Sequence, residues 1–345
     1  MPAPPIRPGP IREALDAGHG LIRATECDQL GMSRGRLYRL VERGALVGVA
    51  KGVYADGAQL RAADPWGRFR LRTRAFLLAG PPDAHAAGWS SVVLQGLPTL
   101  GPPPAVPSVL RPGSTGSGSN TTVWGRTRFA TVPGRWLGAV DGAAALHPAF
   151  AAVDLARHAT SAAGLVLADA VARRPGGREE LAGALRDILT WSGAGRAGRI
   201  IRLSDPDAES PLESLGRLAF LNGRLPAGRS NCWVGEFVPE FRLDHYWPEF
   251  RVGAEADGIG KYLTDPAAAI RKEKAREWRF QELGIRLLRY GWSIAFHQPA
   301  VLADRLRALL AAPIPPAPVP VRVWARADGA ALLGLPLSAP DRSGR

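Results

Sequence analysis

Apolar residues recur with a helical period near the front of the chain. Leu37, Leu40 and Val41 lie at spacings i, i+3 and i+4, which places them on one face of a helix. Ser33 comes directly before this stretch, and serine is a favoured helix N-cap. The pattern therefore predicts an amphipathic helix over residues 34–43 with one buried face.

Turn residues on both sides of this helix predict its neighbours. Upstream, Thr25 is a favoured N-cap for a short helix over 25–30, and Gly31 supplies a tight turn between the two helices. Downstream, two short β-like runs within 46–54 predict a hairpin with Lys51 near its tip. Two short helices joined by a glycine turn and followed by a hairpin are typical of a winged helix-turn-helix.

The middle of the chain is predicted to be a mostly helical connector domain over 61–205. Proline, glycine and serine are frequent over 96–120, which predicts a loop there. β-like runs follow at 121–124 and 128–132, and helical patterns resume over 148–191. Nothing in this segment indicates a chemical role.

Helical and strand-like patterns alternate in the third segment, residues 206–312. The predicted order is one helix, three strands, a helix, a strand and a final helix, with bounds near 211–222, 231–236, 238–246, 250–256, 266–283, 285–290 and 299–312. The proline-rich end, residues 313–345, is expected to be extended or disordered. We therefore expect a multidomain α+β protein, with a winged helix-turn-helix over residues 1–60 and an αβββαβ domain over 206–312.

Composition narrows the class of protein further. The chain has 345 residues, of which 46% are hydrophobic and 22% are charged, so it can bury a core in each of two or three domains. No apolar stretch is long enough for a membrane span, no secretory signal is visible, and two cysteines cannot form a disulfide framework. We expect a cytoplasmic protein without a membrane partner.

The net charge of +13 indicates an anionic partner, most simply double-stranded DNA. An arginine-rich composition alone would also raise the charge, but the excess lies mostly in the first 80 residues. Arginine on a helix in the major groove can bond guanine through two hydrogen bonds, and a basic hairpin tip can hold a phosphate. An ordinary solvated helix face would show the same residues. The side chains expected to contact DNA are Arg34, Arg36, Tyr38, Arg39, Arg43 and Lys51.

This front segment has a family resemblance. It contains the run TECDQLGMSRGRLYRLVERGALVGVAKGVYA, with an LGMS turn, an LxxLVERGAL helix end and a KGVY wing. These elements resemble the N-terminal winged helix of AbiEi-type antitoxins of type IV toxin–antitoxin systems. The resemblance covers about residues 20–55. It implies a transcriptional regulator that binds its own promoter and has a cognate toxin as a possible protein partner.

Two acidic residues are expected to meet on the sheet of the third segment. Asp244 and Glu255 lie in successive predicted strands, and pairing of those strands would place the carboxylates on one face about 5 Å apart. Two carboxylates at that distance repel unless a cation joins them, and Mg²⁺ or Mn²⁺ prefers such oxygen ligands. The pair therefore predicts a metal site, in which the bound ion would activate a water molecule to attack a phosphodiester.

The same region resembles the PD-(D/E)xK nuclease superfamily, and within it the small domains related to very short patch repair endonucleases. The resemblance rests on SPLES, on RLDHYWPEFRVGAEADGIGKY and on EKARE. It implies that Asp244 and Glu255 are metal ligands and that Glu213 is the supporting acid of the first helix. Glu213 is equally explained as the third residue of a helix capping box.

One part of the nuclease signature differs. Asp257 stands where the signature has a lysine, and Lys261 takes the place of a histidine in the closest group. We therefore treat Lys261 as the candidate catalytic lysine, with Lys272 and Lys274 as alternatives, because lysine can lose its proton at moderate cost and arginine cannot. Clustering of these lysines on an exposed helix is the plain alternative.

Three functions follow from these observations. The first is DNA-binding regulation of the antitoxin type. The second is a Mg²⁺- or Mn²⁺-dependent endonuclease that its winged helix directs to DNA, with Asp244, Glu255, Glu213 and Lys261 as the catalytic residues. The third is a non-enzymatic protein-interaction module on a decayed nuclease fold.

Overall fold

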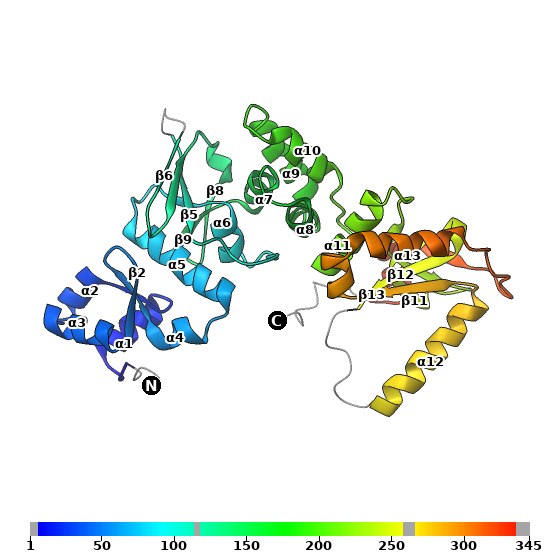
Figure 1. The fold of residues 1–345 in the computed structure, drawn as a ribbon, viewed down its shortest axis with the longest axis horizontal. Helices are drawn as coiled ribbons and strands as arrows, with labels where there is room; N and C mark the ends of the chain where they lie inside the picture. The colour runs from blue at the N-terminus through cyan, green and yellow to red at the C-terminus, as the bar shows by residue number, and fades with distance from the viewer. Residues whose placement is uncertain (1–5, 114–117, 258–265, 336–345) are drawn as a thin grey trace. The chain divides into compact units, whose positions relative to one another are not determined.

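The computed structural model describes residues 6–113, 118–257 and 266–335, with the side chains of 266–273 outside the description. The chain forms two compact units. The first comprises Met1–Ala159 together with Glu179–Ile201, and the second comprises Thr160–Arg178 together with Arg202–Arg345 (Figure 1). Each unit contains helices and at least one sheet, so the chain is an α+β protein with several sheets.

The front of the first unit is a small helical layer on a three-stranded sheet. Its elements are α1 (Pro10–Ala17), β1 (Leu21–Arg23), α2 (Ala24–Gln29), α3 (Arg34–Glu42), β2 (Leu46–Ala50) and β3 (Val53–Asp56). The strands are antiparallel in the order β1-β3-β2. The apolar face predicted for α3 packs onto a core of Leu15, Ile22, Cys27, Met32 and Leu46.

Capping interactions explain where the two short helices begin and end. Ser33 Oγ accepts a hydrogen bond from the Arg36 backbone N–H, as its N-cap position predicts. After α3, Gly44 adopts φ +66° and lets the backbone N–H groups bond back onto the last turn. The prediction that Thr25 caps α2 is wrong. The helix begins one residue earlier, and the Glu26 carboxylate accepts from the Arg23 N–H at 2.7 Å.

The rest of the first unit is a six-stranded sheet with helices. The strand order is β6-β7-β5-β4-β9-β8, with a mixture of parallel and antiparallel pairs. The elements are α4 (Gly57–Ala62), α5 (Pro65–Ala79), β4 (His85–Ala86), α6 (Trp89–Leu94), β5 (Ser108–Arg111), β6 (Gly118–Thr121), β7 (Arg126–Phe129), the 3₁₀ helix η1 (Gly134–Trp136), β8 (Leu137–Val140), β9 (Ala143–Leu146), α7 (Pro148–Ala156), and chiefly α9 (Gly177–Asp187) and α10 (Ala194–Arg202).

This sheet corrects the prediction for residues 61–205. The segment was expected to be mostly helical, with a loop over 96–120, but β5 and part of β6 lie inside that loop. The strands have at most four residues, and every side chain of β6 is exposed, so they show no alternation of apolar and polar residues. These strands form a sheet because they pair with neighbouring strands, and such pairing cannot be recognised from the sequence.

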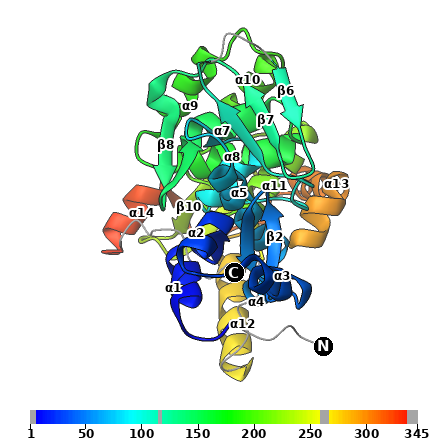
Figure 2. The same cartoon turned by 90° about the vertical axis from the view of Figure 1, so that its left-hand side faces the viewer.

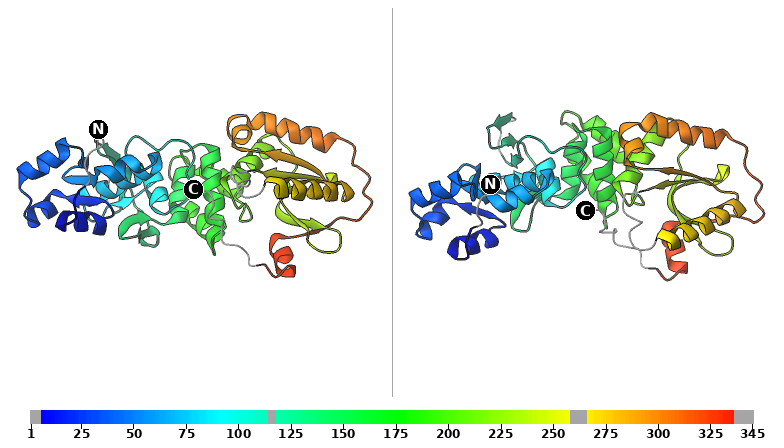
Figure 3. Two further views of the ribbon diagram at one scale, coloured as in Figure 1. Left: turned by 90° about the horizontal axis from the view of Figure 1, so that it is seen from below. Right: turned by 60° about the horizontal axis from the view of Figure 1, so that its bottom comes forward.

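The second unit is built around a five-stranded sheet in the order β13-β12-β11-β10-β14. Its elements are α8 (Ser161–Ala172), α11 (Pro211–Asn222), β10 (Arg229–Gly235), β11 (Phe241–Trp247), the 3₁₀ helix η2 (Pro248–Phe250), β12 (Val252–Ala256), α12 (Pro266–Glu282), β13 (Arg286–Tyr290), the π-helical turn η3 (Ser293–His297), α13 (Pro299–Ala311), β14 (Arg322–Trp324) and α14 (Arg326–Leu332). From α11 to α13 the helices and main strands follow the predicted order. Strands β10, β11 and β12 are antiparallel, and β13 runs parallel to β12. Helices α12 and α13 lie on opposite sides of the sheet (Figure 3).

The prediction that residues 313–345 form an extended or disordered tail is corrected within residues 313–335. Val323 pairs with Val234 and so adds β14 to the exposed edge of β10. Helix α14 follows, and a Cβ at Gly329 would lie 2.2 Å from the Trp233 ring, so only glycine allows this approach. The strand could not be predicted from sequence, because the residues before it are rich in proline and because its stability comes from pairing with β10.

None of the helices within the described residues is long and apolar enough to cross a bilayer.

Candidate functional site

Helix α3 presents a basic face opposite its core-packing face. Leu37, Leu40 and Val41 pack against the core, and α3 lies against β2 (Figure 2). The remaining side chains point outward, and Tyr38 is 64% exposed. The exposed residues include all five that sequence analysis assigned to this helix or its end, namely Arg34, Arg36, Tyr38, Arg39 and Arg43.

The hairpin after α3 adds a sixth exposed residue. Lys51 and Gly52 form the turn between β2 and β3, and Gly52 has φ +69°. This left-handed conformation favours glycine and makes the two-residue turn possible. The Lys51 side chain therefore projects into solvent at the tip of the hairpin.

The cations of this surface lack carboxylate partners. Among the residues that the structure describes, none of the four arginines and no lysine of the α3–hairpin surface forms an ion pair with Asp or Glu. Arginines elsewhere are paired, for example Arg217 with Asp169 and Arg242 with Glu209. An unpaired cluster of exposed cations keeps its positive potential and can exchange counterions for phosphates.

The second candidate site is acidic and lies where the ladder between β11 and β12 ends. The last paired residues there are His245 and Ala254. Beyond them, Asp244 Oδ2 accepts a hydrogen bond from the Ala256 backbone N–H at 2.7 Å, so its side chain bridges the two strands. Burial first, and then the negative charges of Glu213 and Glu255, together raise the pKa of Asp244 to about 7, although the hydrogen bond from the Ala256 N–H opposes this rise.

Glu213 is placed in this region by the start of α11. Ser210 Oγ caps the helix by accepting from the Glu213 N–H at 3.2 Å. The Glu213 carboxylate accepts from the Glu209 N–H at 2.8 Å and from the Asn231 side-chain amide at 2.6 Å. Burial raises the pKa of Glu213, and the nearby charge of Glu209 adds to this effect. Glu213 therefore has the structural role of a cap, and it also stands within electrostatic reach of Asp244.

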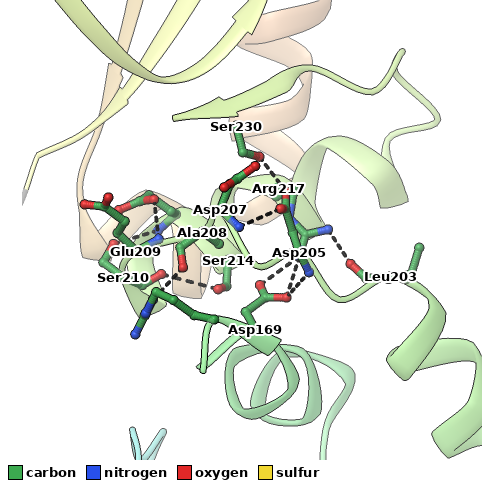
Figure 4. Close-up of polar contacts among 12 residues, drawn as sticks. Asp169, Leu203, Asp205, Asp207, Ala208, Glu209, Ser210, Ser214, Arg217 and Ser230 are labelled. Carbon is green, nitrogen blue, oxygen red and sulfur yellow. Dashed lines mark hydrogen bonds and ion pairs between the residues drawn. The ribbon is translucent and has the colours of Figure 1, made fainter. Parts of the chain in front are cut away.

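A polar network anchors the beginning of α11 to α8 (Figure 4). Arg217 binds both carboxylate oxygens of Asp169 at 2.7 and 2.8 Å and donates to the Leu203 carbonyl. Asp169 also accepts from the Asp205 N–H, and Asp205 accepts from Ser230. Arg217 therefore does not pair with Glu213 on the same helix, because the buried Asp169 takes its guanidinium. Among the described residues, Glu213 forms no ion pair with an arginine.

Glu255 differs from Asp244 in having cations beside it. Its carboxylate forms an ion pair with Arg276 of α12, and Arg289 of β13 lies 3.7 Å away. Two guanidinium groups supply the positive charge that a metal ion would otherwise bring. Across the described part of the chain, no group of three or more His, Cys, Asp or Glu side chains is arranged to hold a metal ion.

The lysine candidates are placed only in part. Lys261 lies outside the described residues, and the side chain of Lys272 is not described. Lys274 is exposed on α12. His245 is 2% exposed and its Nε2 lies 2.9 Å from the Tyr290 hydroxyl, so it belongs to the core.

Sequence reasoning missed the arginines that surround the acidic site. Arg276 lies within the EKARE motif, in which the sequence indicates a lysine as the candidate residue. Arg242 of β11 binds Glu209, which lies outside that strand. Arg326, which binds the same Glu209 at 2.8 Å, comes from the segment expected to lack structure. For the contacts of Arg276, Arg242 and Arg326, the sequence offered a signal only at Arg276, through the EKARE motif.

The front segment is similar in sequence to a known protein family. Residues 10–55 match the family described as "Transcriptional regulator, AbiEi antitoxin". The resemblance over about 20–55 is confirmed, and the match extends upstream to residue 10, so that it includes the unpredicted helix α1. The antitoxin-family segment therefore contains α3 and the hairpin with all six exposed residues of the basic surface.

Relatives and a solved structure extend beyond this segment. The chain is 30% identical over 169 residues to "Uncharacterized protein MT2308" and to "Uncharacterized protein Rv2248", from two strains of Mycobacterium tuberculosis. The match covers 48% of this chain and 62% of each relative. A crystal structure of the RV2827C protein from Mycobacterium tuberculosis aligns with a TM-score of 0.34 and 18% identity, covering 59% of this chain and 85% of that one.

Proposed function

We propose that the protein is a DNA-binding transcriptional regulator of the AbiEi antitoxin type. The observation that carries the proposal is the cluster of exposed cations without carboxylate partners on α3 and the β2–β3 turn. The antitoxin-family match over residues 10–55 supports it independently. Double-stranded DNA is the proposed partner of this surface, and a cognate toxin is the protein partner that an antitoxin would have.

The order of elements supports a winged helix as the DNA-binding module. Helix, strand, two helices and a hairpin follow one another, and β3 lies between β1 and β2 in the sheet. In a helix-turn-helix the second helix of the pair enters the major groove. That helix is α3 here, so Arg36, Arg39 and Arg43 would read bases and Lys51 would hold a phosphate.

Binding to the DNA upstream of the protein's own gene tests this proposal. Fluorescence anisotropy at several salt concentrations gives both affinity and the number of phosphates contacted. Because Lys51 is the proposed phosphate contact, Lys51→Ala should reduce the slope of log K against log salt by about 0.9. Arg39→Ala should weaken binding to the upstream DNA by about 1–3 kcal/mol and reduce the preference over unrelated duplexes, while alanine preserves the helix.

Arg70→Ala is the matched control, because Arg70 is an exposed arginine of the same unit on α5. It should leave both affinity and slope unchanged. Equal affinity for unrelated duplexes at moderate salt would contradict a regulator with a defined site. Unchanged binding by Arg39→Ala would contradict the assignment of α3.

A second candidate function rests on the acidic site. Asp244 is the carboxylate that best fits a metal ion, because the negative charges of Glu213 and Glu255 lie nearby and its Oδ1 accepts no hydrogen bond from any described residue. Glu255 would be the second ligand, in competition with Arg276. A bound Mg²⁺ or Mn²⁺ would lower the pKa of a water molecule and neutralise charge on a phosphodiester. Glu213 would support the site, and Lys261 is the proposed catalytic lysine.

Cleavage of DNA tests this second function. Supercoiled plasmid, mismatched duplex and single strands are incubated with Mg²⁺ or Mn²⁺, and nicking should disappear in Asp244→Ala. The control is Asp304→Ala, which removes an exposed carboxylate of α13. A protein that cuts none of these substrates is not this nuclease, and the second unit would then be the interaction module of the third hypothesis.

A further inference from the structure

A cavity of about 300 Å³ lies within the first unit, and none of the residues that line it belongs to α3 or to the acidic site. Its floor is the sheet, where Arg126 and Arg128 of β7 stand beside Ser108 and Leu110 of the parallel strand β5. Helices α5, α6 and α7 and the segment 104–106 supply the walls. The volume is at the lower end of the range for small-molecule sites in proteins.

Positive charge exceeds negative charge around this cavity. Asp154 is the sole acidic residue among those that line it, and its buried carboxylate binds both Arg128 and Arg157. Arg126 is exposed at the cavity and donates to the Ser119 hydroxyl at 3.0 Å. Within the described residues Arg126 has no carboxylate partner. Two guanidinium groups therefore line the cavity, and its one carboxylate is already paired with Arg128 and with Arg157 beside the cavity.

One arginine in the cavity is buried with an incompletely satisfied guanidinium. The Nε of Arg128 is shielded from solvent and has no hydrogen-bond partner among the described residues. The two terminal nitrogens of Arg128 hold Asp154 and so fix the guanidinium in place. A preorganised arginine pair of this kind is suited to an anionic group with several acceptor oxygens.

The walls of the cavity are apolar and aromatic. Phe69 is 3% exposed, and Trp89 and Leu155 also line the space. Trp66 packs against this wall. Its ring centroid lies 5.6 Å from that of Phe69 and 5.3 Å from that of Trp89. Aromatic residues with two or three fixed polar groups are typical of sites for flat organic ligands.

We propose that this cavity binds a small organic anion, with an acidic group held by Arg126 and Arg128 and a flat apolar body against Phe69 and Trp89. Arg126 is the anchor that decides affinity, because its charge is not neutralised by a carboxylate of the protein. The aromatic wall selects a ligand with one or two rings over a bare inorganic anion. Carboxylate, sulfonate and phosphate groups all meet this chemistry.

Two probes that differ by a single group test the proposal on the full chain. They are 1-anilinonaphthalene-8-sulfonate and its uncharged parent N-phenyl-1-naphthylamine, and binding is followed by probe fluorescence. The sulfonate should bind the wild-type protein at least about tenfold more tightly than the parent, as expected for a charge-assisted contact. Arg126→Met should remove that advantage and leave binding of the uncharged probe within about twofold.

Further variants separate this cavity from other apolar surfaces. Ala105→Trp places a bulky side chain at the lining and should abolish binding of both probes at this site. Arg70→Gln, which changes an exposed arginine that does not line the cavity, should alter neither. The side chain of Arg126 makes a single hydrogen bond to a described residue, so the folded state should survive its replacement, and circular dichroism checks this.

The proposal is overturned if Arg126→Met leaves the preference for the sulfonate intact, or if Ala105→Trp leaves both probes bound. It is equally overturned if the wild-type protein shows no preference between the two probes.

Discussion

Asp244→Asn should stabilise the protein at pH 8 far more than at pH 5, in the presence of a chelator. The folded state holds the pKa of Asp244 at about 7, against an ordinary value of 3.8, because burial and two neighbouring carboxylates disfavour the charged form. Above pH 3.8 the unfolded chain releases this proton while the folded chain keeps it. Stability is therefore lost as the pH rises towards 7, and the loss is complete above that pH.

The size of the effect follows from the displacement of the pKa. A rise from 3.8 to about 7 corresponds to about 4 kcal/mol of lost stability at high pH, of which more than a third is already lost at pH 5. Asparagine carries no charge and can still accept the hydrogen bond from the Ala256 N–H. The gain in the free energy of unfolding should therefore be about 3 kcal/mol larger at pH 8 than at pH 5.

Urea denaturation at both pH values measures this difference, and hydrogen exchange of peptides spanning 241–256 localises it. Asp304→Asn makes the same chemical change at an exposed ion pair on α13 and should show no comparable dependence on pH. Added Mg²⁺ should remove part of the penalty in the wild-type protein if Asp244 binds the ion. An Asp244→Asn gain that is equal at both pH values, or a loss at both, would refute the reasoning.

Three further predictions concern a close contact, an ion pair and a strand edge within the units. Gly216→Ala should lower the free energy of unfolding by about 2 kcal/mol in a urea titration, because the new Cβ would lie 2.1 Å from the buried Tyr290 hydroxyl. Gly195→Ala, whose Cβ would meet nothing closer than 4.0 Å, should be neutral or gain up to about 1 kcal/mol. Asp154→Asn should lose about 3 kcal/mol by the same measurement, because two arginines then face a neutral amide; a loss below 1 kcal/mol would contradict the buried pairing. Truncation before residue 313 should expose the edge of β10 and cause association visible by light scattering, whereas a soluble, equally stable product would mean that β14 protects nothing.

The front segment was predictable because its signals are local. The apolar spacing of α3, the Ser33 cap and the Gly52 turn each depend on residues close together in the chain, and the structure has all three. The error at Thr25 is of one or two residues and arises because Glu26 caps the backbone of Arg23. Helix α1 was missed because proline and glycine precede and follow it closely.

The middle sheet was not predictable in the same way. Strands such as β6 have only polar, exposed side chains, and their existence depends on hydrogen bonds to β7. Pairing between strands distant in sequence leaves no period in either strand. A short strand within a glycine- and serine-rich stretch therefore looks like a loop.

Prediction of the acidic site was limited by partners distant in sequence. The acids themselves could be chosen from strand order and motif, since the order of elements in 206–312 was visible. Their charge environment could not, because Arg276 and Arg289 reach Glu255 from a helix and a strand further along the chain. Whether a carboxylate meets another carboxylate or an arginine depends on this tertiary arrangement.

The position of β14 in the sheet has a consequence for synthesis of the protein. Its partner β10 ends at residue 235, and the residues that complete the pair are 322–324. At a translation rate of about 5–20 residues per second, the ribosome needs roughly 4 to 18 seconds to make the intervening stretch. Throughout that interval the nascent chain presents an unpaired strand edge, so we expect chaperone binding to protect the β10 edge until residues 322–324 have been added.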